Sequence, residues 1–467
     1  MLEMSLPTAE YDPSKSKPEP SLTLHAEYLP NIRQVSLQIS VEAPTNADAD
    51  FEISLSESGM SVSVSLPGSD DGAGHLSETL KLPVRAGQGA RRVLNTRASG
   101  RLNGHTTSAL NVNNSGDKGS LRMREFSYRM PVDEEDVQRS ALEEVMDAFV
   151  PWAAGDMDSY TSLRCRKCES VLLDVPELCA AVASPSGKSQ SVGWTWKDLP
   201  SGNWAEMMDF WHCHKPDDHE HDDDSAAKQS AEDQNSKVKG YGASNQVLAS
   251  SGTVLVDVAT FLVSDRDCKG LKKKVSEKHM ENSSSSGEEL FCEGCGTLIG
   301  VEDAIAQGWR LFKAGLSAAF PVAEGRSEVK WECHSPDLVV AAQLLELIER
   351  ESARRFIIHC GKKDGLLLWV FNPDMRYSST GTGHSIALHR AMKVFFQPTD
   401  NVDDLLHPEP GKTSSLSLEE LRLPPDTFTA FCHALENSNS RLPQSARKFQ
   451  RDWSVGLLHR HERVKPT

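Results

Sequence analysis

Two CxxC motifs place the strongest constraint on how this chain can fold. They are Cys165-Arg-Lys-Cys168 and Cys292-Glu-Gly-Cys295, the second followed by Gly296. Two thiolates at this spacing can bind one tetrahedral ion at ~2.3 Å, and a second pair completes a four-thiolate site. We therefore predict one structural zinc ion bound by all four cysteines, which requires the fold to bring the motifs together. The alternatives are two separate half-sites or two pairs of buried thiols.

The long stretch between the motifs contains two polar insertions, residues 215–250 and 276–289. The first includes Asp217-Asp-His-Glu-His-Asp-Asp-Asp, and the second includes Ser283-Ser-Ser-Ser-Gly. Neither can bury enough apolar area to offset the entropy of ordering it, so both are predicted to be disordered. The two motifs can then lie close in space. His219 and His221 could bind a metal loosely, although a solvated acidic loop is the favoured interpretation.

Residues 1–20 are polar and proline-rich, with neither the apolar core of a signal peptide nor an arginine-rich amphipathic face. No run of about eighteen apolar residues predicts a membrane span. We therefore expect the protein in the nucleus and cytoplasm, without a membrane partner. In such a reducing compartment the ten cysteines are better interpreted as free thiols or metal ligands than as disulfides.

The formal net charge is −17, with 67 acidic and 50 basic residues. A protein that binds nucleic acid through its phosphates needs a positive surface. The short basic runs, Lys272–Lys274 and Arg447–Arg451, are more simply ordinary solvated surfaces. We expect no direct nucleic-acid binding.

The N-terminal part alternates apolar and polar residues, the period of a half-buried strand. Residues 22–27, 35–41, 51–55 and 60–66 follow this pattern, with breaks rich in Pro, Gly, Asn and Asp. Several short strands of this kind favour an antiparallel β-sandwich-like domain. Acidic residues at Asp133–Asp136 then open a predicted connector helix.

The C-terminal part mixes helices with strands. Ser335-Pro-Asp predicts a helix start, and a second helix is expected at 426–435. Strands are expected at 355–360, 366–371, 391–397 and 453–458. The run Leu366-Leu-Leu-Trp-Val-Phe371 is apolar throughout, which predicts burial on both faces.

These patterns predict a β-rich α+β fold in which a sandwich-like domain precedes a zinc-stabilised mixed domain with a largely antiparallel sheet. The predicted boundaries are a disordered terminus at 1–20, a β-rich domain at 21–130, a connector helix at 131–160, a zinc region with its insertions at 161–300, and an α+β domain at 301–467.

A further candidate site lies between the motifs, at Trp211-His212-Cys213-His214. Consecutive side chains diverge on a strand or helix, so they rarely bind one ion together. Either one of them completes the zinc site, or the tripeptide lies at a loop tip and contacts a partner, with Trp204 and Trp211 as its apolar anchor. A third possibility is that Cys213 is simply packed. We favour the partner-binding interpretation.

The chain shows no catalytic motif of the serine hydrolase, P-loop, HExxH or dinucleotide-binding type. Cys432 lies on a predicted amphipathic helix beside Phe431 and His433, and we expect it to be buried and structural. No catalytic residue is predicted.

Taken together, the motifs resemble those of the HECT-like ubiquitin ligase family, whose members are also called ubiquitin-conjugating-enzyme-binding proteins. The resemblance covers residues from about 160 to the C-terminus. It rests on the two CxxC motifs, the segment ending in His212-Cys213-His214, and the later segments Leu368-Trp-Val-Phe-Asn-Pro-Asp-Met-Arg-Tyr-Ser-Ser, Met392-Lys-Val-Phe-Phe, Leu442-Pro-Gln-Ser-Ala-Arg-Lys-Phe-Gln and Trp453-Ser-Val-Gly-Leu-Leu.

The resemblance implies two kinds of function. One is a binding or maturation factor in messenger-RNA 3′-end cleavage and polyadenylation, whose partner is the zinc-dependent cleavage endonuclease; the cysteine of a His-Cys-His tip could bind that partner's zinc. The alternative is a HECT-like ubiquitin-protein ligase or ligase adaptor that binds a ubiquitin-conjugating enzyme and a cyclin. A thioester-forming ligase needs an exposed, activated cysteine, and Cys432 lacks that setting. We therefore expect the first function.

Overall fold

A computed structural model describes most of the chain, in eleven ranges. They are residues 21–44, 51–66, 76–98, 121–133, 150–175, 193–199, 247–274, 288–321, 329–380, 388–407 and 418–462. The chain divides into two compact units, and each contains segments that are distant in sequence. The N-terminal unit is Met1–Asp147, Asp374–Lys393 and Asn437–Leu457, and the second unit is Ala148–Pro373, Val394–Glu436 and Leu458–Thr467.

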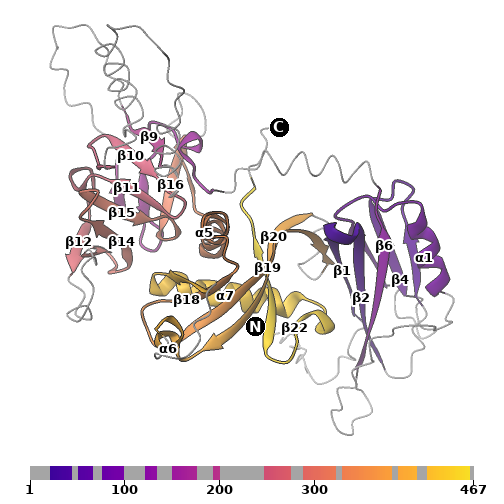
Figure 1. Ribbon diagram of the computed structural model, residues 1–467. Helices are drawn as coiled ribbons and strands as arrows, with labels where there is room; N and C mark the ends of the chain where they lie inside the picture. The colour runs from indigo at the N-terminus through magenta and orange to yellow at the C-terminus, as the bar shows by residue number, and fades with distance from the viewer. Residues whose placement is uncertain are drawn as a thin grey trace, which may run out of the picture. The chain divides into compact units, whose positions relative to one another are not determined.

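The N-terminal unit contains two antiparallel sheets around one apolar core. Strands β1 (Ser21–Leu29), β2 (Gln34–Pro44) and β6 (Leu121–Pro131) are paired in the order β1-β2-β6. The smaller sheet is β3 (Glu52–Leu55), β4 (Ser61–Leu66) and β5 (Leu76–Lys81), and helix α1 (Gly89–Ala98) packs on β3 and β6. Residues of both sheets share one core, including Leu24, Leu37, Val64 and Leu80. The sandwich-like domain predicted from the alternation is therefore confirmed (Figure 1).

Part of the C-terminal chain completes this unit. His25 and Glu27 of β1 pair with Ser379 and Tyr377 of β19 (Gly365–Ser379), in antiparallel register. The other face of β1 carries Leu22, Leu24, Ala26 and Tyr28 into the apolar core, so the two faces of this strand are chemically distinct. The face of β1 that carries His25 and Glu27 is polar. On this face the Lys393 Nζ atom lies 2.9 and 2.8 Å from the two Glu27 carboxylate oxygens.

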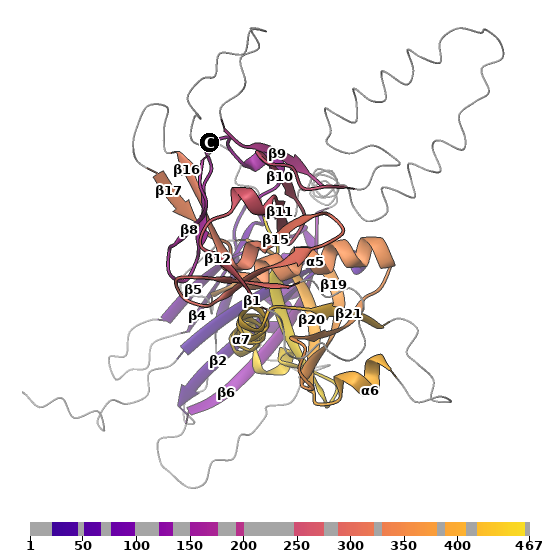
Figure 2. The ribbon, with the colours of Figure 1, turned by 90° about the vertical axis from the view of Figure 1, so that its left-hand side faces the viewer.

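We call residues 150–334 the cysteine lobe of the second unit. Its larger sheet has the order β12-β13-β14-β15-β11-β10-β9, antiparallel except for β9 beside β10. These strands are β9 (Thr195–Asp198), β10 (Thr253–Val256), β11 (Thr260–Val263), β12 (Leu271–Lys274), β13 (Glu289–Cys292), β14 (Leu298–Asp303) and β15 (Gly308–Phe312). The smaller sheet has the order β17-β16-β7-β8, and β16 and β17 lie side by side in Figure 2. Its strands are β7 (Leu163–Cys165), β8 (Val171–Leu173), β16 (Leu316–Pro321) and β17 (Val329–Glu332).

The remaining elements lie between Pro336 and His459. The helices are α5 (Pro336–Glu351), α6 (Val402–Leu406) and α7 (Pro425–Arg441), and the strands are β18 (Arg355–His359), β19, β20 (His389–Thr399), β21 (Leu418–Arg422), β22 (Lys448–Phe449) and β23 (Trp453–His459). Helix α5 begins with Ser335 at the N-cap position and Pro336 in the first turn, as predicted, although the Ser335 side chain makes no capping hydrogen bond. Strand β18 is antiparallel to β19 and parallel to β21. The predicted β-rich α+β class is therefore confirmed, with sheets that are largely antiparallel.

One prediction about β19 is wrong. Its run Leu366–Phe371 is not buried on both faces, because Leu367 and Trp369 are half-buried and Phe371 is exposed. Residues 134–149 of the predicted connector helix at 131–160 lie outside the described residues, and its described ends contain the last residue of β6 and a short 3-10 helix at Ala154–Asp156. Both predicted insertions lie outside the described residues except for 247–250 and 288–289. None of the helices in the described ranges is long and apolar enough to span a lipid bilayer.

Candidate metal centre

The two CxxC motifs occupy matching turns in the cysteine lobe. The first joins β7 to β8, and the second joins β13 to β14. In the first turn the Glu169 N–H donates to the Cys165 carbonyl at 2.9 Å, and in the second the Gly296 N–H donates to the Cys292 carbonyl at 2.8 Å. Each leading cysteine also donates its own N–H, at 2.9 Å, to the carbonyl five residues on. The two turns therefore have the same backbone hydrogen-bond pattern.

Both turns contain a left-handed residue four positions after the leading cysteine. Gly296 has φ +70°, as the glycine in this position predicts, whereas Glu169 adopts φ +62°. A residue with a Cβ pays about 1–2 kcal/mol for this conformation. The Glu169 carboxylate accepts a hydrogen bond from Arg164 at 3.1 Å, which anchors the strained residue. A turn that keeps this conformation without glycine is held by its surroundings.

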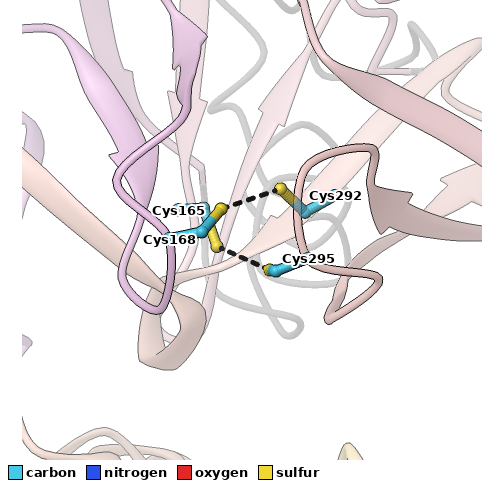
Figure 3. Close-up of side chains that lie close together, drawn as sticks. All are labelled: Cys165, Cys168, Cys292 and Cys295. Atoms are coloured by element: carbon cyan, nitrogen blue, oxygen red, sulfur yellow. Dashed lines mark hydrogen bonds between the residues drawn. The ribbon is translucent and has the colours of Figure 1, made fainter.

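The turns bring the four sulfurs into one cluster (Figure 3). The Sγ atoms of Cys165 and Cys295 are 3.7 Å apart, and those of Cys168 and Cys292 are 3.4 Å apart. All four lie within 4.8 Å of one another. Sulfurs bound tetrahedrally at ~2.3 Å are separated by about 3.8 Å, so the cluster is close to the size that one metal ion needs. It is also the only group of three or more potential metal ligands among the described residues.

The leading cysteine of each motif is buried in the lobe's core. Cys165 and Cys292 are fully buried among residues such as Leu163, Phe261 and Ile299, and burial raises the pKa of both thiols, that of Cys165 to about 12. In the same sites, backbone N–H groups two and three residues on donate to each sulfur, which favours the thiolate. Thiolates with amide donors in an apolar core are stable when a cation neutralises them.

The second cysteine of each motif is half-buried and lies beside a hydroxyl. Ser170 Oγ is 3.3 Å from Cys168 Sγ, and Thr297 Oγ1 is 3.2 Å from Cys295 Sγ. The Ser170 hydroxyl helps to lower the pKa of Cys168 to about 6. Sequence analysis missed both hydroxyl residues. The signal was available, because each lies five positions after the leading cysteine of its motif.

The first turn is tied to neighbouring parts of the lobe. Cys165 pairs with Leu316 of β16, and the Arg166 N–H donates to the Gly315 carbonyl at 2.9 Å. The Arg166 guanidinium also donates to the His334 carbonyl at 2.8 Å, just before α5 begins. In the second turn, Cys292 pairs with Leu271 of β12. A metal ion at this centre would therefore hold together both sheets of the lobe.

The remaining candidate residues fall into two groups. Trp211, His212, Cys213 and His214 lie outside the described residues, as do His219 and His221, so the partner-binding tip stays a prediction. Cys432 is half-buried on α7 rather than fully buried. Burial raises the pKa of the Cys432 thiol to about 11, with a further contribution from Glu436.

Comparison with known proteins gives one family match and two relatives. A profile of the HECT-like Ubiquitin-conjugating enzyme (E2)-binding family matches residues 27–455. An uncharacterized protein of Saccharomyces cerevisiae is 26% identical over 264 residues, which cover 55% of this chain and 61% of that protein. An uncharacterized protein of Schizosaccharomyces pombe is 22% identical over 318 residues, covering 66% of this chain and 77% of that protein. No solved structure matches the chain.

Proposed function

Because the chain belongs to the HECT-like ubiquitin-conjugating enzyme (E2)-binding family, we propose that it is a zinc-stabilised protein that binds a ubiquitin-conjugating enzyme without accepting ubiquitin itself. The observation that carries this proposal is the extent of the family match, from residue 27 to residue 455, which includes segments of both units. A match of that extent concerns the whole fold rather than a shared metal-binding motif.

Zinc is the ion that best suits the four cysteines. Four thiolates around a tetrahedral ion leave no open coordination position, which is the arrangement of structural rather than catalytic zinc sites. An iron–sulfur centre also uses four cysteines. The two differ in colour and in metal content, so elemental analysis together with a visible absorption spectrum of the purified protein identifies the ion.

The surroundings of Cys432 support binding without thioester formation. A thiol with a pKa near 11 is almost entirely protonated at neutral pH, and the thiolate is the nucleophile. His359, in the strand that leads to Cys360, has both ring nitrogens engaged, because Nδ1 accepts the Gly361 N–H at 3.2 Å and Nε2 lies 2.8 Å from a Glu420 carboxylate oxygen.

The test is to mix the purified full chain with individual purified ubiquitin-conjugating enzymes, each uncharged or carrying ubiquitin as a thioester. We expect binding to at least one enzyme by calorimetry, and no reducible ubiquitin adduct on the chain by non-reducing gel electrophoresis. An adduct that disappears in Cys432→Ser would replace the proposal with the ligase function. Failure to bind any enzyme of the panel would reject it outright.

The predicted role in messenger-RNA 3′-end processing has a different basis. It rests on the family resemblance and on His212-Cys213-His214, so it stays a prediction. Its test is Cys213→Ser, which should leave melting temperature and zinc content unchanged and weaken binding to the cleavage endonuclease. A destabilised or zinc-depleted variant would instead indicate that Cys213 is a core residue or an internal ligand.

A further inference from the structure

Three aromatic rings form a cluster on one face of strands β19 and β20. The ring centroids of Trp369 and Phe395 are 5.3 Å apart, those of Phe371 and Phe395 are 5.0 Å apart, and those of Trp369 and Phe371 are 6.1 Å apart. Phe395 is buried and Trp369 is half-buried, but 50% of Phe371 is exposed. The cluster therefore has a packed base and an exposed ring at its edge.

Phe371 is unusual among the exposed apolar residues. Phe371 and Tyr160 are the aromatic members of the large hydrophobic residues that are exposed in the described ranges, and Phe371 is the one whose ring packs against other rings of a cluster. Scattered exposed aliphatic residues are normal on a protein surface. A ring that extends a packed aromatic cluster into solvent is the arrangement found at the centre of protein–protein interfaces, where aromatic residues are enriched.

An unpaired cation lies next to the rings. Arg355 of β18 pairs with Trp369 of β19 in the sheet, and its guanidinium carbon is 5.4 Å from the centre of the Trp369 ring. Arg355 is exposed, and none of the carboxylates in the described ranges makes an ion pair with it. Its charge is available to a carboxylate of a partner.

We propose that Trp369, Phe371, Phe395 and Arg355 form the surface on which the ubiquitin-conjugating enzyme docks. The enzyme would place an apolar side chain against the exposed Phe371 ring and a carboxylate beside Arg355. This inference rests on the proposed function, because that function supplies the partner. The surface supplies the two features of an interface hot spot, an aromatic anchor on a rigid strand and an arginine stacked on a ring.

The experiment uses the full zinc-loaded chain and an enzyme that binds the wild type. Phe371→Ala should raise the Kd by about tenfold or more, since truncated hot-spot residues have effects of this size. Arg355→Glu should raise the Kd by a similar factor, and its effect should shrink at high salt because the interaction is ionic. Zinc content and melting temperature of each variant show whether it is folded.

Two matched variants serve as controls. Val329→Ala truncates an apolar residue of nearly the same exposure, 51%, on β17 of the cysteine lobe. Lys272→Glu reverses a charge on the exposed edge strand β12. Both should change the Kd by less than about twofold, because surface substitutions outside an interface have small effects.

The possible results test the proposed docking surface and the proposed function separately. If the wild type binds an enzyme and Phe371→Ala binds it equally well, the surface is wrong and the proposed function stands. If the wild type binds no enzyme, both proposals fall. If Phe371→Ala instead abolishes a dimer seen by light scattering and leaves enzyme binding intact, the cluster is an interface between two copies of this chain and the inference is overturned.

Discussion

The core of the N-terminal unit and the core of the cysteine lobe are both built from antiparallel strands, but they differ in what completes them. The first is formed by aliphatic residues, tyrosines and Met130 from two sheets, α1 and the segment between β5 and α1, with no cysteine among its buried members. The second includes the fully buried thiols of Cys165 and Cys292. Burial of apolar side chains is enough to stabilise the first core. The second contains thiols whose ionised form is stable in an apolar environment only when a metal ion neutralises it.

The N-terminal unit does bury charge, but it provides its own partner. Burial by itself would raise the pKa of Glu27, yet the Lys393 ammonium and the His25 ring outweigh it and lower that pKa to about 2. Both Glu27 oxygens are within 2.9 Å of Lys393 Nζ. In the N-terminal unit the buried anion is neutralised by a side chain of the same chain, and in the cysteine lobe a metal ion from solution would take that role. Only the second arrangement would make folding depend on the metal supply.

The largest expected effect is the loss of the metal. Cys292→Ser should abolish stoichiometric zinc and remove several kcal/mol of folding free energy from the cysteine lobe, because metal binding to such a site is folding energy. Amide hydrogen exchange should show the lobe's strands losing protection while β1, β2 and β6 keep theirs.

The control for this prediction is Cys333→Ser, which changes an exposed cysteine in the same lobe. It should keep a full equivalent of zinc. The proposed difference between the two cores is wrong if Cys292→Ser retains its metal, or if loss of metal unfolds the N-terminal unit together with the lobe.

The second expected effect concerns the buried ion pair and its pH dependence. The folded-state pKa of Glu27 lies below its ordinary value of 4.5, so the stabilisation is present above that pH and is lost as the pH falls toward 2. Glu27→Gln should therefore lower the stability of the N-terminal unit at pH 7 by about 3 kcal/mol. The difference from wild type should shrink below pH 4.5.

The cysteine lobe should respond differently to acid, because its ligands must be deprotonated to hold the metal. It should lose protection at a higher pH than the N-terminal unit. The double variant Glu27→Gln with Lys393→Met should recover part of the loss, since replacing both partners leaves no unpaired charge. Denaturant unfolding at several pH values, followed by hydrogen exchange, measures both effects.

The sequence predicts local patterns well in this chain, and it predicts neighbours in space poorly. The alternation at 60–66 gives β4, and the CxxC spacing identifies the four cysteines that the structure brings together. No linear pattern shows that Asp374–Lys393 and Asn437–Leu457 join the N-terminal unit, because periodicity indicates which face of a strand is apolar and not which strand lies next to it. The apolar run Leu366–Phe371 predicts burial on both faces, but it does not show whether another element covers each face, and Phe371 is exposed.

A smaller effect is expected at the two glycines of the second CxxC turn. A Cβ on Gly294 would lie 2.7 Å from Ser170 Oγ and 3.3 Å from Cys168 Sγ, whereas a Cβ on Gly296 would meet no atom within 4 Å. Gly294→Ala should displace the Ser170 hydroxyl from Cys168 and speed zinc transfer to a chelator by about tenfold, the lower end of the effects known for groups that support metal ligands. Gly296→Ala should cost about 1 kcal/mol from its left-handed conformation, with a weaker effect on the metal. Equal rates of zinc release in the two variants would contradict the role of Gly294 in letting the first turn approach the second.

The smallest effect separates the metal-centre thiols from the remaining ones. Cys432 is half-buried on α7, and its pKa near 11 leaves it protonated at neutral pH, so it should react slowly with a thiol reagent in the native protein. Cys333, which is exposed, should react first and so provides the internal reference. Cys432→Ser should change stability by less than about 1 kcal/mol and leave zinc content and enzyme binding unchanged, because it removes no ligand and opens no large cavity. Mass spectrometry of the labelled peptides over time measures the order of reaction. If Cys432 reacts as fast as Cys333, its environment is not the apolar one described here, and the case for a non-catalytic protein loses its main structural support.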